Sequence, residues 1–227
     1  MNADAHSPTW TVRDCLVSDL TAVRDLHSLC FSPDEHVPMM LGGRYVLATY
    51  RWLSTGPRSY CLVAADDATG TLVGACSISD QPYARPMFIA CLPTFIMSVA
   101  LRPNLLLRSK LWRRLFRSSH HPPNGERDSP PDGLAEVATV LVHPAWRGRG
   151  IFEALMRSSA DRSAARGNKG IKAGVYKSNT ASRRAFSKLG WKEAPALETG
   201  DTVFYVAEFG PNAGIGAVSS DHETHRS

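Results

Sequence analysis

The sequence predicts a single α/β domain, and three observations support this prediction. The chain has 227 residues, a length that suits one domain, and 43% of them are hydrophobic, enough for a sizeable core. Segments with the two-residue alternation of strands are interspersed with segments that repeat at helical spacing. In the second half, Gly167 and Gly190 follow directly on helical segments, where helices commonly end.

The first part of the domain is expected to contain a strand, two helices and a β-hairpin. Ser18 is a suitable N-cap for the first helix, and apolar residues then recur at helical spacing. Turn-forming residues 66–70 join the two β-rich runs of the hairpin. In chain order, these elements are residues 10–13, 18–29, 43–53, 60–65 and 71–78.

The second part returns to regular alternation after an irregular segment. That segment, 81–133, contains helical candidates at 94–101 and 106–117 and a proline-rich loop at 120–132. The alternation that follows predicts a strand at 134–142, a helix at 150–166, a strand at 171–176, a helix at 179–189 and a strand at 202–209.

The most informative segment runs from Val140 to Phe152, where a strand enters a glycine-spaced turn that opens a helix. The free amides at the helix N-terminus, together with its dipole, form an anion site suited to a phosphate or pyrophosphate. Gly148 and Gly150 let the backbone approach the phosphates, and Arg147 and Arg149 add positive charge. A tight turn with solvated arginines also fits, whereas the Walker and dinucleotide patterns do not.

Two motifs resemble the GNAT superfamily of coenzyme-A-dependent N-acetyltransferases. The turn is similar to its pyrophosphate loop, Q/R-x-x-G-x-G/A, with Phe152 where Gly or Ala is usual when the motif starts at Arg147. Residues 179–191 match the family's N-x-x-A-x-x-x-Y-x-K-L-G-F helix in spacing, with Phe186 at the tyrosine position.

This resemblance implies a mixed, twisted β-sheet flanked by helices that splays between its fourth and fifth strands. We expect a GNAT-like domain at 9–209, with a helical insertion at 81–133 between the third and fourth strands and flexible termini at 1–8 and 210–227. The co-substrate implied is acetyl-CoA. Its pantetheine arm would lie in the cleft, its pyrophosphate on the loop, and Asn179 would contact it from the other wall or serve only as a helix cap. The expected binding residues are Val140, Leu141, Val142, Arg147, Gly148, Arg149, Gly150, Ile151, Phe152 and Asn179.

The activity implied is transfer of an acetyl (acyl) group from acetyl-CoA to a primary amine by direct attack, through a tetrahedral intermediate. The amine must first lose a proton, and Glu136 is the expected base; a solvent-facing carboxylate, or His143 as the base, are the alternatives. Phe186 cannot supply a proton to the leaving thiolate. Tyr176 is the expected acid; Tyr205, Ser182, or departure of the thiolate without an acid are the alternatives.

A different function class stays open. The departures at Phe152 and Phe186 also fit a catalytically weak or inactive GNAT scaffold that binds acyl-CoA as a sensor or interaction module.

The net charge of +5 is local. Six basic residues and no acidic one lie between Arg102 and Arg117, which argues against nucleic acid as a partner. This segment fits an acidic acceptor such as a nucleotide-linked amino sugar, an anionic membrane surface, or a packed helix with solvated arginines. A homodimer is a further open possibility.

Five scattered cysteines without a C-x-x-C pair indicate neither a disulfide framework nor a metal site. Neither a transmembrane run nor a secretory signal is evident, so we expect a cytoplasmic protein.

Overall fold

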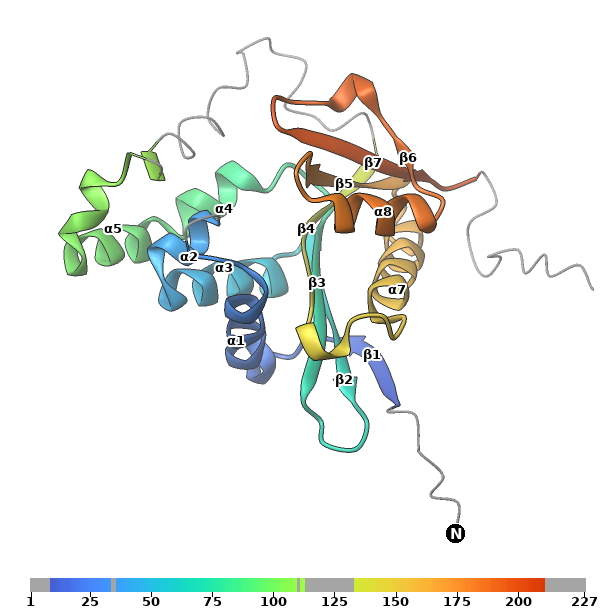
Figure 1. Ribbon diagram of the computed structural model, residues 1–227, viewed down its shortest axis with the longest axis horizontal. Coiled ribbons are helices and arrows are strands. Elements are labelled where there is room, and N and C mark those ends of the chain that lie inside the picture. Colours follow the sequence, from blue (N-terminus) through green and yellow to red (C-terminus); the bar gives the residue numbers. More distant parts are fainter. Residues whose placement is uncertain (1–8, 34–35, 110, 113–132, 211–227) are drawn as a thin grey trace, which may run out of the picture.

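The computed structural model describes residues 9–33, 36–109, 111–112 and 133–210, and Figure 1 shows their arrangement. Seven strands form one sheet in the order β1-β2-β3-β4-β5-β7-β6. Their bounds are β1 Trp10–Asp14, β2 Ser59–Asp66, β3 Leu72–Ser79, β4 Leu134–Val142, β5 Gly170–Tyr176, β6 Lys192–Glu193 and β7 Thr202–Glu208. The pair β4–β5 is parallel and the other neighbouring pairs are antiparallel, so the predicted mixed sheet is confirmed.

Helices cover both faces of the sheet (Figure 1). On one face lie α1 Leu20–Cys30, α2 Val37–Leu41 and α3 Gly43–Thr55. On the other lie α7 Ile151–Ala165 and α8 Thr180–Lys188. Short 3-10 turns are η1 Val17–Asp19, η2 Pro103–Leu107, η3 Pro144–Trp146 and η4 Pro195–Leu197.

Two hydrophobic clusters sandwich the sheet. Every residue of β2 and β3 is buried, because helices cover these strands on both sides. Leu62 and Ile78 face α7 and α8, whereas Val63 and Ala75 face α1 and α3. The alternation of side chains along each strand thus builds both clusters at once.

Between β3 and β4 lie α4 Ala84–Ala90, α5 Leu92–Leu101 and η2. They pack against α2 and α3 through a third cluster that contains Tyr45, Cys91 and Leu105. The helix expected at 106–117 is present in part. Its first residues belong to the 3-10 turn η2, and Ser109, Leu111 and Trp112 are helical. The remaining residues of that prediction lie outside the described part of the chain.

The other predicted elements are found within a few residues of their expected ends. The short elements α2, α4 and β6 were not predicted. The loop at 120–132 and the termini at 1–8 and 211–227 lie outside the described residues. Within the described ranges no single helix has the length and apolar character to cross a membrane, although α4 and α5 together, bent by 61°, pass that test on length and composition alone.

Candidate functional site

The sheet opens between β4 and β5. Their pairing runs only from Leu134↔Gly170 to Val137↔Ala173. Beyond it, β4 stays paired with β3 as far as Val142, and β5 stays paired with β7 as far as Tyr176. Among the described residues, the edge of β4 from Ala138 onward therefore has no strand beside it. This is the splay expected between the fourth and fifth strands, and it leaves backbone groups of β4 available to a ligand.

A β-bulge in β4 marks the start of the splay. Ile78 pairs with Val137 and Ser77 pairs with Thr139, so Ala138 is the extra residue. Before the bulge, Val137 belongs to the core beneath α7, whereas after it Leu141 belongs to the core beneath α1 and α3. The bulge thus exchanges the two faces of β4 where β5 departs. The sequence analysis did not foresee it, because an apolar run with one extra residue has no distinct pattern.

The glycine-spaced turn has the backbone expected of an anion site. Gly148 and Gly150 have φ angles of 78° and 79°, in the left-handed region that favours glycine. A Cβ on Gly148 would meet no atom of the protein within 4 Å. Gly150 is the N-cap of α7 and provides no side chain to bond the first amides of the helix. The turn therefore presents backbone donors to open space.

The side chain of Ile151 anchors the first turn of α7 to the sheet. Ile151 is buried, and its side chain reaches β3, where a Cβ on Gly74 would lie 2.7 Å from Ile151 Cγ2. Only the backbone of Ile151 is thus available to a ligand. The ring of the next residue, Phe152, packs edge to face against the ring of Phe186, with centroids 5.1 Å apart.

The side chains around the turn leave it basic. Arg147 and Arg149 are exposed, and the guanidinium of Arg149 lies 4.7 Å from the ring centroid of Trp146. The acidic residue in the first turn, Glu153, is paired with Arg157 one turn further along at 2.7 Å. Nearby, the thiol of Cys30 donates to the carbonyl oxygen of Val142 at 3.4 Å.

His143 has a structural position before the turn. Its Nδ1 accepts a hydrogen bond from the amide of Ala145 at 3.2 Å and so caps η3. This contact favours the turn role over the alternative role as a base.

Glu136 lies on the part of β4 that is paired with β5, two residues before the bulge. Its carboxylate is ion-paired with Lys172 Nζ at 3.1 Å, directly across the parallel ladder. The phenol of Tyr83 lies near it, and Tyr176 lies near Tyr83. Burial of Tyr83 raises its pKa well above the ordinary value, and the charges of Glu136 and Tyr176 raise it further. Tyr176 itself is 54% exposed at the end of β5.

Tyr83 is a site residue that the sequence analysis missed. It precedes α4 in the irregular segment, where no periodicity assigns a side chain to a face. Its proximity to Glu136 depends on how that segment folds back on the sheet.

In the second motif, residues 179–191, the first residue caps a helix and the aromatic residue lies in the core. Asn179 is the N-cap of α8, and its Oδ1 accepts from the amide of Ser182 at 3.0 Å. Asn179 is exposed, and its Nδ2 donors are not part of that bond. Phe186 is buried, and the hydroxyl of buried Tyr205 donates to Glu193 at 2.6 Å. Tyr205 is therefore a poorer proton donor for the splay than exposed Tyr176.

Together these features suit an elongated ligand with an anionic end. At about 3.4 Å per strand residue, Glu136 lies roughly 20 Å along β4 from Val142, which leads into the turn. An anionic group at the turn and a reactive group beside Glu136 would thus be connected by an arm along the free edge of β4.

Comparison with known proteins agrees with this geometry. The model of the acetyltransferase (GNAT) family matches residues 116–191, which include β4, the turn, α7, β5 and α8. A search of curated proteins finds no match.

Several solved structures share the fold. The GNAT domain of S. lividans PAT superimposes with a TM-score of 0.57 at 16% identity, over 92% of this chain and 100% of that one. PaiA N-acetyltransferase from Thermoplasma acidophilum, in complex with coenzyme A, gives 0.56 at 11% identity over 88% and 99%. YncA from Salmonella typhimurium, with its cofactor acetyl-CoA, gives 0.51 at 18% identity over 90% and 96%. Residues 116–191 thus match the acetyltransferase (GNAT) family model, and the described chain shares its fold with GNAT structures.

Proposed function

We propose that this protein is an acyl-CoA-dependent N-acetyltransferase that transfers an acetyl group from acetyl-CoA to a primary amine. The observation that carries the proposal is the free edge of β4 leading directly into the glycine-spaced turn at the N-terminus of α7. The similar structures of PaiA and YncA, with coenzyme A and acetyl-CoA, support the choice of co-substrate.

The residues present fit this co-substrate. The backbone of Val140, Leu141 and Val142 lies on the free edge and would pair with the amide-containing pantetheine arm. The amides that follow Gly148 would bind the pyrophosphate, and the exposed guanidinium groups of the turn would add charge. Asn179 would contribute its Nδ2 donors from the opposite wall.

Acetyl-CoA supplies an acetyl thioester, and the protein must then manage two protons. A lysine-like amine, with a pKa of about 10.4, has to be deprotonated before it attacks. Glu136 is the proposed acceptor of that proton, directly or through water, and Lys172 holds its carboxylate in place. Tyr176 is the proposed donor to the leaving thiolate, because it is exposed at the end of β5 and lies near Tyr83, which in turn lies near Glu136.

A substitution of Glu136 tests this assignment. Glu136→Gln keeps the size of the side chain and removes its basicity. Release of thiol from acetyl-CoA with a panel of amines should fall by about 10²- to 10⁴-fold, the usual contribution of a general base. Coenzyme A affinity, measured by calorimetry, should stay nearly unchanged. Glu198→Gln, at a surface pair with Lys177, is the control. Equal turnover of Glu136→Gln and its parent would remove Glu136 from the mechanism.

A sensor or interaction module is the second candidate. It is favoured by two observations: the Glu136 carboxylate is already paired with Lys172, and Phe186 is buried without a proton to donate. Binding of coenzyme A without thiol release on any amine of the panel would support it. The acceptor, the cytoplasmic location and the homodimer stay predictions.

A further inference from the structure

Helix α5 is apolar on its exposed side as well as on the side where Phe95 packs on the domain. Its only fully buried residue is Ser98, whose hydroxyl donates to the carbonyl oxygen of Thr94. Ile96 and Leu101, by contrast, are 59% and 62% exposed. A helix that merely packs on a domain has polar residues on its exposed side, because only its buried side gains from apolar contacts.

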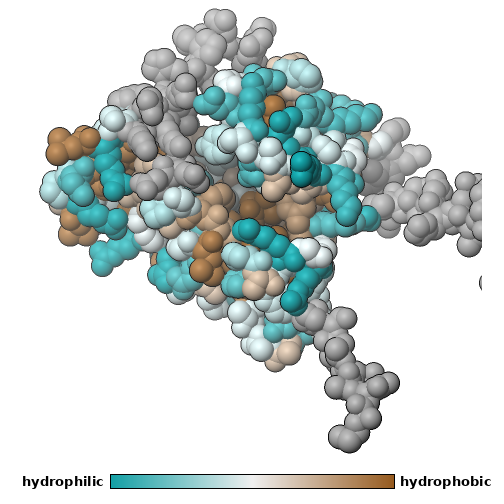
Figure 2. Space-filling view, viewed as in Figure 1, coloured by the Kyte–Doolittle hydropathy of each residue, from teal (hydrophilic) through white to brown (hydrophobic). Residues whose placement is uncertain are grey.

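This apolar surface extends along the chain. Of eleven large hydrophobic side chains that are exposed among the described residues, seven lie between Ile89 and Leu107, on α4, α5 and η2. Brown surface marks the outer left edge of Figure 2, where Figure 1 places α5. We call the exposed apolar side chains of residues 89–107 the α5 face. Scattered exposed leucines need no explanation, but a gathering of this kind indicates an interaction surface.

The same segment is exclusively basic. From Gln81 to Gly125 the sequence contains seven Arg and Lys residues and no Asp or Glu. The apolar helix thus lies in the longest stretch of the chain without an acidic residue.

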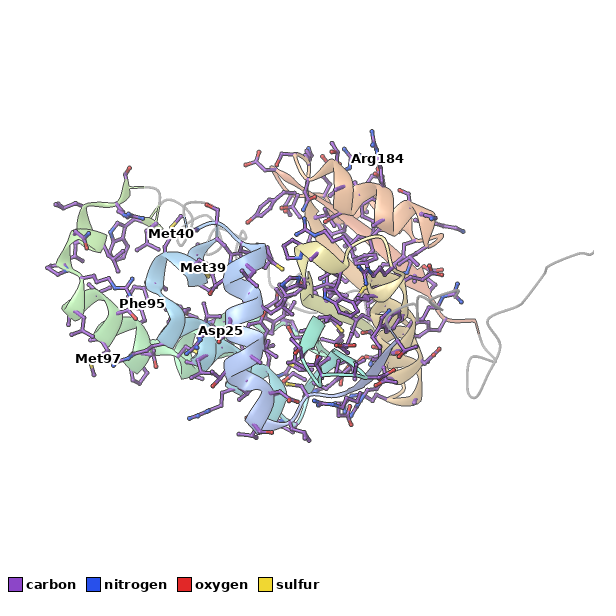
Figure 3. The ribbon with its side chains drawn as sticks, turned by 60° about the horizontal axis from the view of Figure 1, so that its bottom comes forward. Asp25, Met39, Met40, Phe95, Met97 and Arg184 are labelled. Carbon is purple, nitrogen blue, oxygen red and sulfur yellow. The ribbon has the colours of Figure 1, made fainter. Side chains whose placement is uncertain are left out.

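A basic cavity of about 410 Å³ opens beside the α5 face. Arg24 from α1, Arg44 from α3 and Arg102 after α5 line it, together with Met97 and Leu101. Figure 3 shows Met97 on α5, with Asp25, the ion-pair partner of Arg24, on α1. The guanidinium of Arg102 lies against Gly42, where a Cβ would come within 2.2 Å of Nη2. Cationic and apolar groups therefore share one rim.

We propose that the α5 face docks on an anionic lipid bilayer, with Arg44 and Arg102 directed at lipid phosphates and the apolar side chains entering the interface. Stable docking on a membrane surface needs two signals, apolar burial and attraction to anionic lipid, and both are present here. The positive charge of this segment favours anionic lipid over the other possible occupants of the α5 face. A second copy of this chain would place two basic segments against each other, which is unfavourable. A soluble acidic acceptor would occupy the cavity but would leave Ile96 and Leu107 in water. The proposal is independent of acyl transfer.

Vesicle co-sedimentation tests the proposal. The whole chain should bind phosphatidylglycerol vesicles at low salt, and more weakly at high salt or on phosphatidylcholine. The double variant Ile96→Glu/Leu101→Glu should bind at least about 10-fold more weakly, because it removes two inserted side chains and adds two repelled charges. The matched control is Leu16→Glu/Leu29→Glu, at leucines that are 56% and 59% exposed on other elements. It carries the same charge change and should bind much as the parent does.

A second pair of substitutions examines the charges. Arg44→Gln/Arg102→Gln should weaken binding to phosphatidylglycerol by about 10-fold or more, at roughly fivefold for each cation near an anionic surface. Circular dichroism and the melting temperature check that each variant is folded. Absence of vesicle binding, or equal loss in the Leu16/Leu29 control, overturns the proposal. So does a dimer of the parent that Ile96→Glu/Leu101→Glu dissociates without any effect of lipid, because a second copy would then cover the α5 face.

Discussion

Two glycines at opposite ends of α7 allow the anion site to be tested with a matched control. Gly148 before the helix and Gly167 after it have φ angles of 78° and 83°. A Cβ at either position would meet no atom of the protein within 4 Å. Replacing each by leucine should therefore impose the same backbone strain and no clash inside the protein. Only Gly148 lies in the turn that is proposed to bind pyrophosphate.

The expected magnitudes differ between stability and binding. A non-glycine residue in the left-handed region costs about 1–2 kcal/mol, for both variants alike. For a domain of this size, that lowers the melting temperature by about 2–8 °C. Gly148→Leu should in addition lose at least one charge-assisted hydrogen bond to the anion, of about 1.5–3 kcal/mol. This corresponds to about 10- to 100-fold weaker binding of coenzyme A.

Calorimetric titration with coenzyme A, alongside thermal unfolding, separates the two effects. Gly148→Leu should lose affinity, whereas Gly167→Leu should lose only thermal stability. If both variants bind coenzyme A as the parent does, the turn is not the pyrophosphate site. If both lose affinity equally, the loss reflects strain on α7 rather than the site.

Three further perturbations test the packing that supports the site. Burial lowers the pKa of His27 from 6.5 to about 3, so the unfolded chain binds more protons below pH 6.5 and stability should fall as pH drops toward 3, by up to about 1.4 kcal/mol per pH unit; urea unfolding should show this slope, and His27→Gln should flatten it. Tyr60→Phe removes the hydroxyl that is hydrogen-bonded to the buried Oγ of Ser163 at 2.9 Å, so the free energy of unfolding should fall by about 1–3 kcal/mol in the same assay. Gly74→Ala places a methyl group 2.7 Å from Ile151 Cγ2, so it should cost about 1–3 kcal/mol and also weaken coenzyme A binding in calorimetry, since the first turn of α7 must shift.

The sequence predicted the regular elements where local pattern and tertiary packing agree. The helices α1 and α3 repeat apolar residues on one side, and the hairpin β2–β3 is joined by turn-forming residues. The short elements escaped prediction for a physical reason. The strand β6 has two exposed residues and exists because it pairs with β7, so it has no periodicity of its own.

The site was predictable at the turn and less so at its reactive end. Glycine spacing is a backbone requirement, and Gly148 and Gly150 have the positive φ that it implies. The neighbours of Glu136, in contrast, depend on tertiary contact. Lys172 is opposite only because β4 and β5 are parallel in this register, and Tyr83 arrives from a segment without a pattern.

The two departures from the family motifs are physically one feature. Phe152, where a small residue is usual, packs edge to face on Phe186, where a tyrosine is usual. Phe186 also stacks on Tyr205 and contacts Trp191, with centroids 5.7 and 4.9 Å away. A hydroxyl on Phe186 would enter this apolar cluster and need a partner there, and a glycine at Phe152 would remove one wall of the cluster.

Because Phe152 and Phe186 pack on each other, they support an inactive scaffold less strongly than two independent departures from the motifs would. It joins the first turn of α7 to α8, while Ile151 joins the same turn to β3. The amides proposed to bind pyrophosphate are thus held from two sides, which favours a preorganised anion site. The proton that a tyrosine would donate must then come from elsewhere, and the exposed Tyr176 is the proposed donor.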